Sequence, residues 1–217
     1  MDADFQLQDL KHFTTCDIGD ALVKLNYPFG GFLDGLTMYS PSERETRIYG
    51  RAVTVKMVEM NSSGPKPSVH FADCNKAGHI MYIQQPKGMN SACWGGLMST
   101  RANKVGGCGV IVDGRIRDIQ EHKDLNFPVF ARSTSILGSG SFTRASEINV
   151  SLQYKEELWV HPGDILVGDQ DGVVVVPQSL VAQVVALCQE RADVDKKIIA
   201  ALQSGREMGE AIQLLRK

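Results

Sequence analysis

The sequence predicts a layered α/β fold. Short apolar runs rich in β-branched residues alternate with helical segments, a tight turn joins the last two of these runs, and a long amphipathic helix follows them. The chain has 217 residues, of which 43% are hydrophobic, and this is enough to bury a sizeable core. We therefore expect a single domain over residues 1–217, with N-terminal helices over about 1–27 and a C-terminal helical segment over about 179–217.

The first part of the chain is expected to supply short helices, two strands and the loops between them. Residues 14–17, Thr-Thr-Cys-Asp, form a helix start signal. Residues 48–58 and 79–84 have the composition of strands, and residues 70–76 are expected to be helical. The connection over 59–67, Glu-Met-Asn-Ser-Ser-Gly-Pro-Lys-Pro, predicts an irregular loop, for which two roles stay open: it covers the cleft, or it decorates the surface, which the sequence favours.

Residues 94–118 carry the densest set of signals in the chain. Gly95 and Gly96 lead into apolar residues at helical spacing, and Gly106-Gly107 ends this short helix. The apolar run over 108–112 is typical of a strand that is buried on both faces. It is followed at once by Asp-Gly-Arg-Ile-Arg-Asp over 113–118, which we expect to be a charged turn.

The charges in this turn predict a binding site, because charged side chains are rarely buried in a core and this turn has two aspartates and two arginines within six residues. Amides at a helix start attract anions, and ligands of open α/β sheets bind beyond the carboxyl ends of strands. Taken alone, Asp113-Gly114 is more typical of a turn, and Arg117-Asp118 of a solvated surface pair. The glycine turn about 22 residues upstream favours one shared cleft.

The rest of the chain is expected to complete the sheet and end in helices. In order, the sequence predicts a helix over 119–125, a strand over 126–132, an exposed loop over 133–144, a strand over 148–154, and two strands within 158–177 around a turn at 168–172. A long amphipathic helix begins near Ser179, and Gly205 precedes a last short helix.

Composition excludes several classes of function. The formal net charge of −2 argues against a general binder of nucleic acids or anionic membranes. The chain has no apolar run of 18 residues and no secretory N-terminus, so we expect a cytoplasmic protein without a membrane span. The five cysteines are scattered, as expected of reduced thiols, and His70, Asp73 and His79 match no closed zinc motif.

The central stretch resembles the signature of a known family. Trp94-Gly-Gly-Leu97, followed by Gly106 to Asp118 with its Asp-Gly-x-x-Arg-Asp ending, is similar to the family of 4-hydroxy-4-methyl-2-oxoglutarate aldolases and the regulator of ribonuclease activity A, the RraA-like family. Residues 15–22, 50–56 and 163–177 extend the resemblance over nearly the whole chain. It implies an α/β/β/α layered sandwich like the swivelling phosphohistidine domain, assembled as a homotrimer or a dimer of trimers.

The resemblance also implies a reaction on a small 2-oxo acid. Class II aldolases and oxaloacetate decarboxylases of this family release pyruvate through an enolate that Mg²⁺ or Mn²⁺ stabilises. By resemblance Asp118 is the metal ligand, Arg117 pairs with the carboxylate and keto oxygen of the substrate, and both are catalytic. Lys56 and Lys104 are expected to be solvated, because the family forms no imine. The pyruvyl carboxylate is expected on four backbone amides, those of Gly95, Gly96, Leu97 and Met98.

One departure from the family pattern leaves alternatives open. Many relatives carry Asp or Glu at the position of Gly96, where a carboxylate can hold a metal-bound water. Either another carboxylate takes over, such as Glu190 or Asp193 of the C-terminal helix or one of a neighbouring subunit, or aldol chemistry is weakened and decarboxylation of oxaloacetate survives. The alternative function is a regulator without catalysis that binds a protein partner, like the ribonuclease E inhibitor branch of the family.

Overall fold

The computed structural model describes residues 9–41 and 46–215. One eight-stranded mixed sheet has the order β1, β5, β4, β3, β2, β9, β10, with β6 paired to β2, and a separate two-stranded sheet joins β7 to β8. The strands are β1 Thr37–Ser40, β2 Ile48–Glu59, β3 His79–Gln84, β4 Gly109–Ile116, β5 Val129–Thr134, β6 Thr143–Ile148, β7 Leu152–Lys155, β8 Leu158–Val160, β9 Ile165–Asp169 and β10 Gly172–Val176. The part of the predicted N-terminal helices over residues 1–8 lies outside the described residues.

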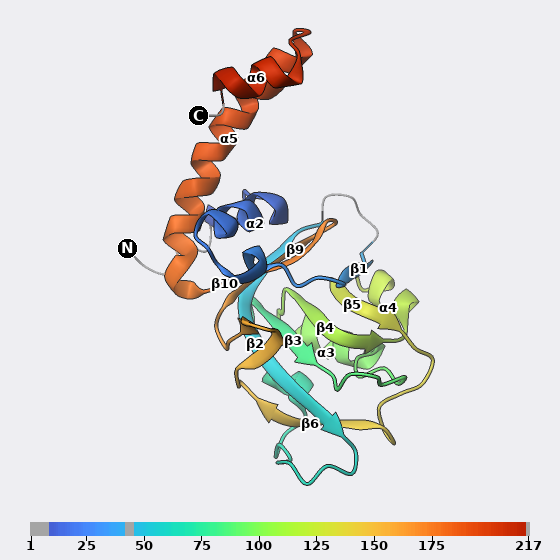
Figure 1. The fold of residues 1–217 in the computed structure, drawn as a ribbon. Coiled ribbons are helices and arrows are strands. Elements are labelled where there is room, and N and C mark those ends of the chain that lie inside the picture. The colour runs from blue at the N-terminus through green and yellow to red at the C-terminus, as the bar shows by residue number, and fades with distance from the viewer. Residues whose placement is uncertain (1–8, 42–45, 216–217) are drawn as a thin grey trace.

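Parallel pairing at the centre of the sheet brings the carboxyl ends of several strands to one edge (Figure 1). β2 pairs in parallel with β3, β3 with β4, and β4 with β5. The helices are α2 Thr15–Lys24, α3 Gly96–Lys104, α4 Ile119–Asp124, α5 Val181–Gln203 and α6 Met208–Leu215, and η1 Pro28–Gly31, η2 Phe71–Cys74 and η3 Gln178–Leu180 are 3-10 turns. α3 and α4 connect successive parallel strands, so the segments that enter these helices meet at that edge.

Three buried clusters separate four layers of secondary structure. The first packs α3 and η2 against the parallel strands and contains Trp94. The second fills the space between two parts of the sheet, where Tyr82 of β3 and Val175 of β10 belong to one cluster with β7 and β8. The third packs α2 and α5 on β9 and β10, around Ile18 and Val174. This succession of helix, sheet, sheet and helix confirms the predicted α/β/β/α arrangement.

Hydrogen bonds within the first turn of α2 and to the β9–β10 turn hold the start of this helix in place. Thr14 and Asp17 form a capping box, in which the Asp17 carboxylate accepts the Thr14 N–H at 2.9 Å and the Thr14 hydroxyl accepts the Asp17 N–H at 3.1 Å. The Asp169 carboxylate, 7% exposed, accepts the backbone N–H and the hydroxyl of Thr15 at 2.9 and 2.7 Å, and also the Asp171 N–H. The predicted helix start and the predicted turn therefore belong to one hydrogen-bonded unit.

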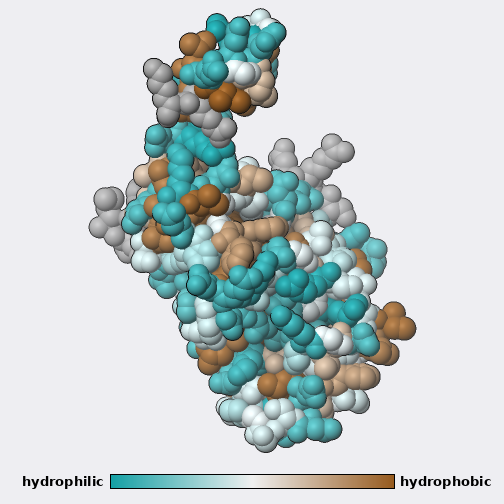
Figure 2. Space-filling model, viewed as in Figure 1, coloured by the Kyte–Doolittle hydropathy of each residue, from teal (hydrophilic) through white to brown (hydrophobic). Residues whose placement is uncertain are grey.

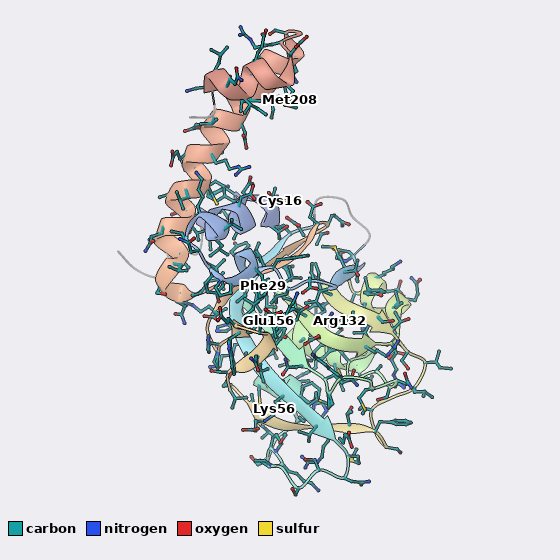
Figure 3. The ribbon with its side chains drawn as sticks, in the orientation of Figure 1. Cys16, Phe29, Lys56, Arg132, Glu156 and Met208 are labelled. Atoms are coloured by element: carbon teal, nitrogen blue, oxygen red, sulfur yellow. The ribbon has the colours of Figure 1, made fainter. Side chains whose placement is uncertain are left out.

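The C-terminal helices form an arm that extends from the layered body (Figure 1). Val184 and Cys188 of α5 are buried in the cluster over β9 and β10, while the second half of α5 carries α6 beyond the body. Hydrophobic residues remain on the surface of this arm (Figure 2), among them Met208 at the start of α6 (Figure 3). Among the described residues, no helix has the length and apolar content needed to cross a bilayer.

Four of the predicted elements differ from the structure. Residues 158–177 hold three strands, β8, β9 and β10, rather than the predicted two, because β8 pairs with β7 in the separate sheet. Asp113 and Gly114 do not form a turn, because β4 continues through them to Ile116, with a change of register against β5 between Val112 and Arg115. The segment predicted as a helix over 70–76 is only the 3-10 turn η2. The predicted strand over 148–154 is divided into the end of β6 and the start of β7, because the chain turns at Asn149, which has a positive φ of 56°.

Replacing Asp169 by alanine tests the link between α2 and the β9–β10 turn. Asp169→Ala leaves two Thr15 donors and one further N–H without their acceptor, so the free energy of unfolding should fall by about 2–4 kcal/mol. Urea unfolding followed by circular dichroism measures this loss. Asp169→Asn keeps one acceptor oxygen and should lose less, and equal loss in the two variants would contradict the assignment.

Candidate active site

The candidate site lies where residues 92–95 run beside the end of β4. The Cys93 N–H donates to the Arg115 carbonyl at 2.9 Å, and the Arg117 N–H donates to the Trp94 carbonyl at 3.0 Å. This short parallel pairing, which includes a bridge between Trp94 and Ile116, brings Gly95 against Asp118. The two sequence signals that predicted a shared cleft are therefore brought together by backbone hydrogen bonds.

The buried side chain of Trp94 holds the glycine turn in position. Its side chain is 1% exposed, and its indole N–H donates to the Ser99 hydroxyl at 2.8 Å. The ring belongs to the cluster beneath α3, so the largest buried side chain of the chain fixes the residue directly before Gly95.

Arg117 and Asp118 face the glycine turn across a small cleft of about 90 Å³. Asp118 has φ 60° and ψ 42°, in the left-handed region, and this conformation turns its carboxylate back toward α3. Its Oδ2 accepts the Gly96 N–H at 3.0 Å and lies 3.3 Å from Nε of Arg117. A Cβ on Gly95 would lie 2.5 Å from this oxygen, and one on Gly138 would lie 2.8 Å from the Arg117 guanidinium, so a larger residue at either position would displace one of the two charged side chains.

The four predicted anion-binding amides are not equivalent. Gly96 donates its N–H to Asp118, and Met98 donates to the Gly95 carbonyl at 3.1 Å, so these two groups are already paired. The N–H groups of Gly95 and Leu97 have no acceptor among the residues that the structure describes. The first turn of α3 therefore offers fewer free donors than the sequence predicted, because an internal carboxylate already binds there.

A carboxylate that the sequence interpretation did not select lies against Gly96. A Cβ on Gly96 would be 1.6 Å from Oε2 of Glu121, so the Glu121 side chain occupies the space into which a larger residue at position 96 would extend. Glu190 and Asp193, the two carboxylates expected to compensate for Gly96, lie instead on α5, which packs on α2. The sequence signal for Glu121 was its position three residues after Asp118, on the same face of the entry to α4.

The other two charges of the Asp-Gly-Arg-Ile-Arg-Asp run have structural partners. Asp113 is buried and pairs with Nε of Arg132 on β5, and Arg132 also donates to the Tyr154 hydroxyl at 2.7 Å. Burial raises the pKa of Tyr154, which therefore remains protonated and donates to the Asp34 carbonyl. Figure 3 labels Arg132, whose side chain is 41% exposed, so the network reaches the surface of the sheet.

Arg115 links the loop after β3 to the end of β5 at the carboxyl edge of the sheet. Its guanidinium donates to the Met89 carbonyl at 3.0 Å, to the Ser133 hydroxyl at 3.0 Å and to the Thr134 carbonyl at 2.9 Å. Asp113 and Arg115 are therefore used to build the edge, and only Arg117 and Asp118 remain at the cleft.

Comparison with known proteins assigns this arrangement to a family. Residues 15–175 match the model of the RraA-like family, described as Aldolase/RraA. The chain belongs to the RraA-like family. The match includes the glycine turn, the Arg117-Asp118 pair and all ten strands except the last residue of β10. The family resemblance of the sequence is thereby confirmed.

This RraA-like chain is similar over most of its length to two relatives and one solved structure. It is 30% identical over 205 residues to the uncharacterized protein MJ0644 of Methanocaldococcus jannaschii, covering 94% of this chain and 92% of the other. It is 33% identical over 150 residues, 67% of this chain and 69% of the other, to a Halalkalibacterium halodurans protein with the provisional name 4-hydroxy-4-methyl-2-oxoglutarate aldolase. A crystal structure of an uncharacterized Pseudomonas syringae protein aligns with TM-score 0.83 and 28% identity, covering 96% of each chain.

The remaining groups near the cleft are poor nucleophiles and poor zinc ligands. Burial raises the pKa of the Cys93 thiol to about 12, so this lining residue stays protonated at neutral pH. Lys56 forms an ion pair with Glu147 at 2.7 Å and is part of the surface of β2 (Figure 3). Among the described residues, no group of three or more His, Cys, Asp or Glu side chains could hold a metal ion.

A double-mutant cycle tests the contact between Glu121 and Gly96. Gly96→Ala should force the Glu121 side chain out of its position, whereas in Glu121→Ala the same substitution should be neutral or stabilising, because alanine is the better helix former. Urea unfolding of the four proteins should give a coupling free energy of about 0.5–2 kcal/mol. Additive effects would show that Glu121 does not occupy this space.

Proposed function

We propose that this chain is a divalent-metal-dependent lyase that cleaves a C–C bond of 4-hydroxy-4-methyl-2-oxoglutarate-type substrates or of oxaloacetate and releases pyruvate. The observation that carries the proposal is the convergence of Asp118, Arg117 and the first turn of α3 on one small cleft. The aldolase name of the Halalkalibacterium halodurans relative supports it.

The chemistry of the donor set at the cleft fits Mg²⁺ or Mn²⁺, which prefer carboxylate oxygens and water. Asp118 would hold the ion through Oδ1, since its Oδ2 accepts the Gly96 N–H and no described residue donates to Oδ1. Glu121 would supply a second carboxylate, in place of the acidic residue that many relatives carry at the position of Gly96. When bound, the ion supplies a Lewis acid for the keto oxygen of the substrate.

Arg117 and the free amides of α3 would bind the acidic end of the substrate. The planar guanidinium of Arg117 can donate two parallel hydrogen bonds to a carboxylate and a keto oxygen. Its Nε lies 3.3 Å from the Asp118 carboxylate, and a larger residue at Gly138 would occupy the space of its guanidinium. The Leu97 N–H, in the first turn of α3, would add a donor that is aligned with the helix dipole.

We also propose that a neighbouring subunit completes the cleft in a homotrimer or a dimer of trimers. Leu97 at the cleft and Ile136 on the adjoining loop are 85% and 93% exposed. Exposed apolar side chains beside a site, together with those on the C-terminal arm, favour burial against a second copy of the chain.

Removing the Asp118 carboxylate tests the enzymatic proposal. With Mg²⁺ or Mn²⁺ present, Asp118→Ala should lower kcat/KM for pyruvate release from oxaloacetate and from 4-hydroxy-4-methyl-2-oxoglutarate by about 10²–10³. Asp124→Ala is the matched control, since Asp124 is an exposed carboxylate at the end of α4 whose partner is Gln120, and it should retain the wild-type rate.

Two outcomes of this assay would contradict the proposal. Full activity of Asp118→Ala, or full activity of the wild type in chelator, would show that the reaction does not depend on a metal bound by Asp118. Absence of any pyruvate release from the wild type with either metal would favour the alternative, a regulator that binds a protein partner.

Glu121→Gln tests the second carboxylate without relying on turnover. Loss of its charge should weaken Mn²⁺ binding by about tenfold or more, measured by calorimetry or by the spectrum of free Mn²⁺. Glu190→Gln on α5 is the control and should bind Mn²⁺ as the wild type does. The reverse result would assign the second carboxylate to the C-terminal helix of a neighbouring subunit.

A further inference from the structure

A groove of about 460 Å³ lies next to the cleft, between β6 and the connection from β2 to η2. Its apolar lining consists mainly of Met57, Met60, Val69, Phe71, Met98 and Ala145. No acidic side chain lines it. Three methionines in one groove provide a polarizable surface that adapts to flexible apolar ligands.

The groove and the cleft adjoin each other. Both are lined by Met98 of α3 and by Ser139 of the loop before β6. The cleft has about 90 Å³ and the charged groups, while the groove has about five times that volume and is mainly apolar. A ligand whose acidic end lies between Arg117 and the first turn of α3 would extend past Met98 into the groove.

The far wall of the groove is a loop that the rest of the protein holds in place. Arg144 of β6 donates to the carbonyls of Pro65, Ser62 and Gly64 at 2.6, 2.7 and 2.9 Å, and the Ser146 hydroxyl donates to the Pro65 carbonyl at 3.1 Å. The connection over 59–67, for which surface decoration was the favoured of two expectations, lines the groove through Met60, Lys66 and Pro67. The groove is therefore largely formed before any ligand binds.

We propose that this groove binds the apolar substituent of the substrate, so that the chain acts on 2-oxo acids, or their 4-hydroxy aldols, that carry an extended aliphatic or aromatic group beyond C4. The inference rests on the proposed function, because the acidic end of the same molecule lies in the cleft. Lys66, His70 and Arg144 also line the groove, so a ligand that ends in a second carboxylate is the competing occupant that the test must separate from an apolar one.

Binding of 2-oxo acids of graded length tests this inference. In the presence of Mg²⁺, calorimetry should show that affinity rises from pyruvate through 2-oxobutanoate and 2-oxohexanoate to 2-oxooctanoate, by up to about fourfold for each methylene that is buried. 2-Oxoglutarate ends in a carboxylate that Lys66 or Arg144 could pair with, so it should bind less tightly than 2-oxooctanoate if the groove takes an apolar group, and tighter binding would overturn the inference.

Val69→Asp places a charge on the groove, and Val23→Asp on α2 is its matched control, since the two valines are 56% and 61% exposed. Val69→Asp should abolish the gain in affinity with chain length, and Val23→Asp should keep it. A flat series in the wild type, or a gain that survives Val69→Asp, would overturn the inference. Dissociation of an oligomer by Val69→Asp in sedimentation analysis would also overturn it, by assigning the groove to a subunit interface.

Failure of the proposed function has a different signature. If 2-oxooctanoate binds tightly in the groove but oxaloacetate yields no pyruvate with either metal, the binding inference stands and the lyase proposal fails. If pyruvate is released from oxaloacetate and the affinity series is flat, the lyase proposal stands and the groove has no role in binding substrate.

Discussion

The short pairing of residues 93–95 with the end of β4 is the constraint on which the candidate site depends. Two backbone hydrogen bonds fix the distance between the glycine turn and Arg117-Asp118, and the buried Trp94 prevents the turn from moving away. Because these bonds are made by the backbone, they hold for any side chains at the cleft. The relative position of the two segments therefore depends on the main chain and on Trp94, and not on the charged side chains that line the cleft.

Local pattern predicted much of the fold because the deciding interactions are local. β3 has the predicted bounds, and α3 begins at the second glycine and ends before Gly106-Gly107, since apolar period and glycine conformation act within a few residues. The prediction of a turn at Asp113-Gly114 was wrong because the deciding interaction there is between residues far apart in the sequence. The Asp113 carboxylate is stabilised inside a strand by Arg132, whose proximity depends on the parallel pairing of β4 with β5.

The candidate site shows the same division. Glycine spacing and the Arg-Asp ending led to the correct pair of segments, and the structure brings them together. The role of Glu121 against Gly96 could not be predicted, because the overlap depends on how α4 packs beside α3. The position of the 59–67 connection depends likewise on Arg144, about 80 residues later in the chain.

The left-handed backbone of Asp118 limits which residue can serve at this position. Glycine adopts such a conformation freely but has no carboxylate, and asparagine adopts it readily but carries no negative charge. Glutamate has the charge and adopts a positive φ at Glu156, but its longer side chain would carry the carboxylate past the Gly96 N–H. Aspartate alone combines the tolerated geometry, the reach and the charge, so the shape of the main chain selects the amino acid before any ligand does.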